Sequence, residues 1–175
     1  MKALAAALLV FVAACGEGRA ILNVDVLSFL PAGDSAQSYN VPGGIPQADS
    51  AVVVHFALPP GFGKSSADSV SATLAATLAN TGGGGSVTLS VFFSRDSSTI
   101  FSGTPYVTAS SGAVSGVQTV PFGSSTLSLN DSIFNASDLW VGIRARISTN
   151  VGPNMTGQLR LTILGVRIVV QDKVF

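Results

Sequence analysis

Apolar residues recur at every second position in several stretches of this chain, which is the period of a β-strand. The clearest stretch is 86–94, whose apolar row is Val87, Leu89, Val91 and Phe93. Residues 139–147 repeat the pattern, with an expected inward row of Leu139, Val141, Ile143, Ala145 and Ile147. Because successive side chains point to opposite faces of a strand, each stretch predicts one face against a core and one toward solvent.

Turn-forming Gly and Pro residues separate further expected strands, at 21–30, 51–58, 69–79, 106–108, 114–120, 126–129 and 158–170. The run 51–58 is apolar apart from His55 and predicts a buried central strand. Residues 69–79 fit a helix as well, but their Ser and Thr content favours a strand. With 86–94 and the glycines of 82–85 between them, they predict a hairpin.

The apolar row of the last strand changes parity near Gly165, which predicts a β-bulge there. Eight to ten short strands separated by turns, with little helix, predict an all-β fold. The expected architecture is a two-sheet antiparallel β-sandwich, with a jelly roll as one form of it.

Charged residues make up only 10% of the chain, and nine basic residues balance nine acidic ones. This balance gives no electrostatic basis for binding nucleic acid, and none is predicted as a partner. The single cysteine, Cys15, excludes an intramolecular disulfide, so the fold must be stable through packing alone.

The chain begins with Met1 and Lys2, followed by twelve apolar residues at 3–14 and then by Cys15. Such a run is too short to cross a bilayer, which takes about 20 residues, and it matches the apolar region of an export signal. The segment Val12-Ala13-Ala14-Cys15 resembles the lipobox of a bacterial lipoprotein. It departs from the usual pattern in its single n-region charge and in having Val rather than Leu.

This resemblance implies cleavage before Cys15 and a covalent diacylglycerol on its thiol. Residues 1–14 would then be a signal peptide, 15–20 a lipidated cysteine with a short tether, and 21–175 a single domain. The implied location is the bacterial cell envelope outside the cytoplasm, with the membrane as a partner. Gly16 replaces the Asp that marks inner-membrane retention in some Gram-negative bacteria, which favours the outer membrane.

No recognisable catalytic group emerges from the sequence. His55 is the only histidine, and its apolar neighbours favour a structural role over a catalytic one. The segment 61–65 lacks the first glycine of a phosphate-binding loop, with Leu58 in its place, so no nucleotide is predicted. No metal or cofactor is predicted apart from the covalent lipid. Calcium is the alternative, through Asn130, Asp131, Asn135 and Asp138, although their spacing fits no known loop.

Trp140, Arg144 and Arg146 share parity on one expected strand and therefore one face. Exposed, they would form a platform for a sugar or peptide; otherwise the Trp is packed and the arginines pair with Asp on a neighbouring strand. Tyr39, in an expected loop, and Tyr106, within the Gly- and Ser-rich stretch 97–125, are further candidates for stacking on a ligand.

The sequence thus favours a membrane-anchored, non-enzymatic binding or structural module with a glycan or an envelope protein as partner. A carbohydrate-binding module is the more specific alternative. A hydrolase with an unusual site around His55 and a self-assembling surface protein are the others.

Overall fold

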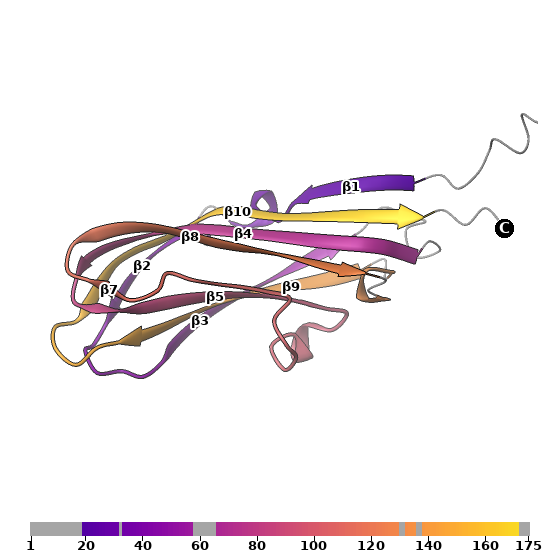
Figure 1. Ribbon diagram of the computed structural model, residues 1–175. Coiled ribbons are helices and arrows are strands. Elements are labelled where there is room, and N and C mark those ends of the chain that lie inside the picture. Colours follow the sequence, from indigo (N-terminus) through magenta and orange to yellow (C-terminus); the bar gives the residue numbers. More distant parts are fainter. Residues whose placement is uncertain (1–18, 32, 58–65, 130–131, 136–137, 172–175) are drawn as a thin grey trace, which may run out of the picture.

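The computed structural model describes residues 19–31, 33–57, 66–129, 132–135 and 138–171, which form two β-sheets packed face to face (Figure 1). Ten strands and three short 3₁₀ turns make up the described fold. They are β1 (Arg19–Asp25), η1 (Val26–Phe29), β2 (Ala36–Val41), β3 (Ala48–Ala57), β4 (Ser66–Gly82), β5 (Gly84–Ser94), η3 (Ser97–Thr99), β6 (Val107–Ser110), β7 (Val114–Ser115), β8 (Gln118–Leu129), η4 (Ser132–Asn135), β9 (Asp138–Thr149) and β10 (Met155–Gln171).

Every strand pairing is antiparallel. Sheet A has the order β1-β10-β4-β8, with β2 continuing along the edge of β10 beyond β1. Sheet B has the order β3-β9-β5-β6, with β7 beside β6 on β5. When β1 with β2, and β6 with β7, are each counted as one interrupted strand, this is the strand order of an eight-stranded jelly roll. The predicted fold class is confirmed.

The core lies between the two sheets. β4 supplies the central row of sheet A, whose members are at most 2% exposed: Val70, Ala72, Leu74, Ala76 and Leu78. Sheet B faces them with buried residues of β5 and β9, including Val87, Leu89, Val91, Leu139 and Val141. The side chains predicted to point inward from β5 and β9 therefore do so. Each buried Leu or Val contributes about 1.5–3 kcal/mol to folding.

β4 and β5 are consecutive strands, but they do not form the predicted hairpin. β4 pairs with β10 and β8 in sheet A, whereas β5 pairs with β9, β6 and β7 in sheet B. Gly83 alone separates them and has φ +65°, which lets the chain pass directly from one sheet to the other. The alternating pattern carries the strand signal but contains nothing that distinguishes a return in the same sheet from a crossing.

β3 is an edge strand, and the prediction of a buried central strand at 51–58 is wrong. It pairs with β9 only, and its outward side chains, Ala51, Val53 and His55, are exposed. Val52 and Val54 point inward and are partly buried against the core. The continuous apolar run therefore does not indicate burial on both faces, because only one row of its side chains faces the core.

β10 carries its bulge earlier than predicted. Its register against β4 shifts between Leu161 and Ile163, so Thr162 is the additional residue rather than Gly165. Leu161 is buried before the shift and Leu164 after it, while Ile163 turns outward and is 50% exposed. The prediction of a bulge is correct, but its predicted place at Gly165 is not.

The expected strand at 21–30 ends early, at Asp25. The Asp25 Oδ1 atom accepts a hydrogen bond from the Leu27 amide at 3.1 Å and caps the η1 turn. The turn directs Val26 and Leu30 into the core, where they are 2% and 9% exposed. They fill the space between the end of β1 and the start of β2 along β10.

Candidate functional site

The outer face of sheet B brings together three of the residues singled out in the sequence. Trp140, Arg144 and Arg146 alternate along β9, and all three side chains lie on the face directed away from the core. β3 runs beside them in register, with His55 opposite Trp140 and Asp49 opposite Arg146. We call Asp138, His55, Trp140, Arg144 and Arg146 the β9 platform.

His55 and Trp140 form the aromatic part of the platform. Their ring centroids are 4.6 Å apart, and the planes are tilted by 45°. The His55 Nε2 atom lies 3.3 Å from the Asp138 Oδ1 atom, and the two side chains are 47% and 61% exposed. His55 is therefore not enclosed by apolar side chains, as its place in an apolar run had suggested, but forms part of an accessible aromatic and carboxylate group.

The Arg144 guanidinium lies against two phenyl rings. Its guanidinium carbon lies 4.5 Å from the ring centroid of Phe101 and 5.3 Å from that of Phe92. The segment around η3 folds over β9 at Gly142, where a Cβ atom would lie 2.7 Å from Phe101 and 3.0 Å from Ile100. Because Gly142 has no side chain, the segment with Ile100 and Phe101 can pack on β9 and contact Arg144.

Arg146 pairs with a carboxylate on the neighbouring strand. Its Nε atom donates to the Asp49 Oδ1 atom at 3.1 Å, and the Gln47 amide donates to the other oxygen at 2.8 Å. Slight burial acts to raise the pKa of Asp49, but the hydrogen bonds from Gln47 and Arg146 outweigh it and the pKa falls below its usual range. Arg146 thus adopts the paired arrangement that the sequence left as the alternative to ligand binding.

Tyr39 and Tyr106 lie away from the platform. Tyr39 belongs to β2, and its hydroxyl donates to the buried Asn80 Oδ1 atom at 2.8 Å. Tyr106 packs edge-on against Phe93 and Phe134, with centroid distances of 5.2 and 5.5 Å. Both side chains therefore have structural contacts in the sandwich, and the structure does not place them with Trp140.

Two sequence predictions fall on residues that the structure does not describe. Cys15 lies before the described residues, and Asn130 and Asp131 of the alternative calcium set lie between two described ranges. Within the described ranges, no three His, Cys, Asp or Glu side chains gather as a metal site would require. Over the same ranges, no helix has the length and hydropathy to span a bilayer.

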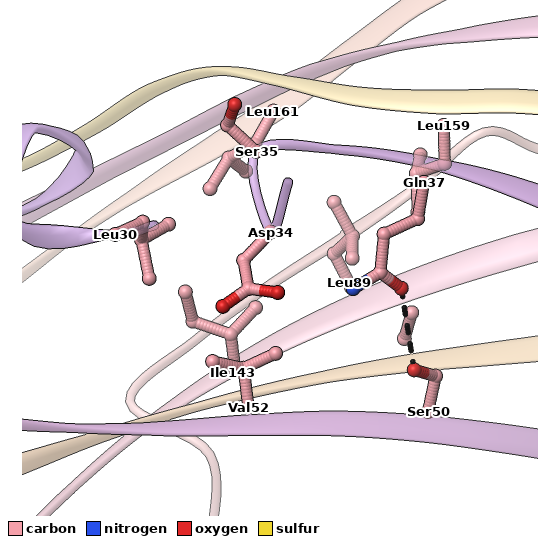
Figure 2. Close-up of a pocket in the computed structure, with 11 residues that line it drawn as sticks. Leu30, Asp34, Ser35, Gln37, Ser50, Val52, Leu89, Ile143, Leu159 and Leu161 are labelled. Carbon is pink, nitrogen blue, oxygen red and sulfur yellow. Dashed lines mark hydrogen bonds between the residues drawn. The ribbon is translucent and has the colours of Figure 1, made fainter. Parts of the chain in front are cut away.

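A cleft runs between the edge strands β2 and β3, where the sandwich is open (Figure 2). The Asp34 carboxylate points into it toward Val52 and Ile143, and Ser50 donates to Gln37 across its mouth at 3.4 Å. Its free volume is about 40 Å³. A space of this size holds about three water molecules. Farther along the same pair of strands, a second hollow of about 200 Å³ is lined by Tyr39, Asp49 and Ile147 among others.

No protein-family model matches this sequence, and no curated protein matches it. Among solved structures, infectious bursal disease virus Gx strain aligns over 90% of this chain with a TM-score of 0.41 and 11% identity. The chain spans 37% of that viral chain. Eiger TNF from S. frugiperda aligns over 78% of this chain and 91% of its own, with a TM-score of 0.37 and 7% identity. TmCBM61 in complex with β-1,4-galactotriose aligns over 87% and 88%, with a TM-score of 0.32 and 11% identity.

Proposed function

We propose that this chain is a lipid-anchored, non-enzymatic module of the bacterial cell envelope that binds a glycan through the β9 platform. The observation that carries the proposal is the ring pair of His55 and Trp140 beside the Asp138 carboxylate, in which His55 and Asp138 are about half exposed and Trp140 is partly buried. Trp is a common anchor residue at binding surfaces because one side chain offers a large rigid area.

The platform has the chemistry that a sugar ring needs. An indole face offers apolar surface to the C–H groups of a pyranose, and the adjacent imidazole extends it. A carboxylate such as that of Asp138 accepts hydrogen bonds from sugar hydroxyls, and the imidazole N–H groups of His55 donate them. Arg144, fixed by the rings of Phe92 and Phe101, adds a rigid donor along the same strand.

The exposure of the polar pair supports binding rather than catalysis. His55 and Asp138 are each about half exposed, on the open face of a sheet. Hydrolytic sites depend on donors and bases held in a water-excluded pocket, where electrostatic interactions are strong. The geometry instead suits recognition of a ligand that lies flat across β3 and β9.

The anchor rests on the lipobox at 12–15 and on a short connection to the fold. β1 begins at Arg19, only four residues after Cys15. Four extended residues reach at most about 14 Å. A diacylglycerol at Cys15 would therefore keep the sandwich at the lipid surface, and two acyl chains give stable anchoring.

Titration with sugars tests the platform, and Trp140 is the only tryptophan, so its fluorescence reports on this site alone. We expect cellohexaose, xylohexaose or chitohexaose to change the emission and to bind in calorimetry. Trp140→Ala should weaken the calorimetric affinity at least ten-fold, whereas Leu129→Ala, on the opposite face of the sandwich, should leave it unchanged. No binding by any of the three sugars would contradict the glycan proposal.

The same sugars test the absence of catalysis. Prolonged incubation should leave their chain length unchanged in mass spectrometry. Shortened products that disappear with His55→Ala would replace the binding proposal with a hydrolase.

Intact mass of the protein from bacterial membranes tests the anchor. The expected mass is that of residues 15–175 with acyl groups on Cys15, and Cys15→Ser should abolish the acylation. An unmodified thiol or an uncleaved leader would overturn the anchored location.

A further inference from the structure

The outer face of sheet A differs from that of sheet B in its apolar content. Three leucine or isoleucine side chains near one end of the sheet are at least half exposed: Ile21 of β1 (51%), Leu127 (67%) and Leu129 (68%) of β8. Ile163 of β10 adds a fourth at 50%. Single exposed apolar residues are normal, but four on one sheet face make it a candidate surface for an apolar partner.

Two arginines stand on the same face. Arg160 and Arg167 project outward from β10, and both are exposed. Neither side chain has an ion pair or hydrogen bond among the described residues, in contrast to Arg146 and Arg144 of sheet B. This face therefore offers two cations without a described partner beside its exposed apolar side chains.

An open groove of about 580 Å³ lies on this face. β1 and η1 form one wall with Asn23, Asp25 and Leu27, and β10 contributes Thr162, Ile163 and Arg167. β10 lies between β1 and β4 in the sheet, and β4 contributes only Ser71 and Thr73 to the groove. The groove exists because β4 carries small residues outward while the bulge at Thr162 turns Ile163 to the surface.

The groove has donors for an anion. Arg167, Ser71, Thr73 and Thr162, whose side chains carry N–H and O–H donors, are among the residues that line it. Arginine binds phosphate through paired N–H donors, and hydroxyls complete such contacts. The carboxylate that lines it, Asp25, is engaged with the Leu27 amide at 3.1 Å. Donors surrounded by exposed apolar side chains match the headgroup and the upper acyl region of a phospholipid.

We propose that the outer face of sheet A rests on the membrane, with Ile21, Leu127 and Leu129 in the interfacial region and Arg167 on the phosphate of an anionic phospholipid. The occupant is the bilayer itself, for two reasons. The face combines positive charge with apolar side chains, as membrane-surface elements do. In addition, the described chain starts on this sheet, at Arg19, four residues after Cys15.

This inference rests on the proposed function and deepens it, because a lipid at Cys15 would hold the start of β1 near the bilayer, and contact through sheet A would leave the β9 platform on the opposite face free. It makes a separate claim, however. Lipidation fixes only where one end of the chain is attached, whereas the groove and the apolar residues determine which face meets the lipid. The two claims can therefore fail independently.

Vesicle binding without the acyl groups tests the face. The chain of residues 15–175 with Cys15→Ser should co-sediment with vesicles of phosphatidylcholine and phosphatidylglycerol, and more weakly with phosphatidylcholine alone. Replacing Arg160 and Arg167 by Gln should lower the partition coefficient about five-fold per arginine, the loss expected for a basic residue near an anionic surface. Arg95→Gln removes the same charge from the β5–η3 loop and should change nothing.

Labelling tests the orientation in the acylated protein, where Cys15 is blocked and an introduced cysteine is the single reactive thiol. A polarity-sensitive fluorophore on Leu127→Cys should shift to the blue on vesicles and be quenched by nitroxide lipids. The same fluorophore on Val53→Cys, on the outer face of sheet B, should stay in water.

Each outcome decides one claim. Equal quenching at both positions, or none at Leu127→Cys, overturns the membrane face even if the anchor is present. Binding of the Cys15→Ser chain that is unaffected by both arginine replacements overturns the role of the groove. Displacement by millimolar inorganic phosphate identifies a soluble anion as its ligand and overturns membrane contact. An unmodified Cys15 with oriented vesicle binding retains the face and rejects the anchor.

Discussion

The amide group of Asn80 joins three separate segments at one end of the sandwich. Its Nδ2 atom donates to the carbonyl oxygens of Gly116 at 2.6 Å and Gly83 at 3.2 Å, and its Oδ1 atom accepts from the Tyr39 hydroxyl at 2.8 Å. Asn80 is 2% exposed, and buried polar groups without partners are costly. This one side chain therefore holds the crossing between the sheets, the turn before β8 and the end of β2 together.

Asn80→Ala should destabilise the protein by about 3 kcal/mol, because it leaves buried carbonyl and hydroxyl groups unpaired. Equilibrium urea unfolding measures the change. Tyr39→Phe, which removes only one of the three hydrogen bonds, should cost about 1 kcal/mol. Equal losses for the two variants would show that the amide has no bridging role.

Burial raises the pKa of Tyr39 to about 12 from its usual 10. The folded state therefore holds the proton more tightly than the unfolded state, and stability must fall as the pH rises from 10 toward 12. We expect the stability advantage of the wild type over Tyr39→Phe to shrink across this window in urea unfolding at each pH. A difference that stays constant would mean that Tyr39 titrates normally.

His55 and Trp140 show what residue-level prediction achieved and missed. The shared face of Trp140, Arg144 and Arg146 followed from parity alone, since the strand containing them was recognised. The meeting of His55 with Trp140 depends on β3 lying next to β9 in a given register, which joins residues 85 positions apart in the sequence. Nothing local encodes that register, so His55 was expected near the core rather than beside Trp140.

At the scale of elements, strands were predictable and their partners were not. Alternation identified β5 and β9, and the Ser and Thr of β4 correctly outweighed its helical spacing. The hairpin between β4 and β5 was wrong because the run of glycines at 82–85 is compatible with both a tight return and a crossing. The conformation and surroundings of Gly83 decide between them.

Gly83→Ala should therefore disrupt the crossing. Its φ of +65° disfavours any side chain, and a Cβ atom would collide with the Asn154 carbonyl group. Gly112 has a similar φ of +68° but open space around it, so Gly112→Ala isolates the backbone cost of about 1–2 kcal/mol. Thermal unfolding of both variants measures the difference, and Gly83→Ala should lose about 1–3 kcal/mol more through overpacking.

Gly142→Ala should release the η3 segment from sheet B. The new methyl group would lie within 3.0 Å of Ile100 and Phe101, so the segment must move and Arg144 loses its ring contacts. We expect faster proteolytic cleavage within 97–105. Gly103→Ala, at a position with nothing within 4 Å, is the matched control. Unchanged cleavage would mean that the η3 segment accommodates the methyl group without leaving sheet B.

At the scale of the whole molecule, the two sheets turn different surfaces outward. Sheet B presents aromatic and paired charged groups, and sheet A presents apolar side chains together with Arg160 and Arg167. The alternating pattern predicted the sandwich, and the sequence contains so few charged residues that each face carries only a few of them. It did not predict the face of sheet A, because Ile163 turns outward only through a bulge whose position became clear in the sheet register.

The two faces should act independently, since the core separates them. Trp140→Ala should abolish sugar binding and leave vesicle binding unchanged, while Leu127→Ser with Leu129→Ser should do the reverse. In the triple variant, the loss measured in each binding assay should match that of the corresponding single-face variant within about 0.5 kcal/mol, as expected for distant sites. Calorimetry and vesicle sedimentation on the same preparations test this, and strong coupling would point to a shared surface.

The pairing of Arg19 with Gln171 at the first rung of β1 has a mechanical consequence. A force applied ahead of Arg19, away from the sheet, loads that rung first and each later rung in turn, so β1 unzips instead of shearing. Unzipping meets resistance at Val26, whose side chain is sealed in the interior at 2% exposure. Under tension β1 would detach and lengthen the connection by one strand, while the rest of the sandwich stays folded and the extension ends at Val26.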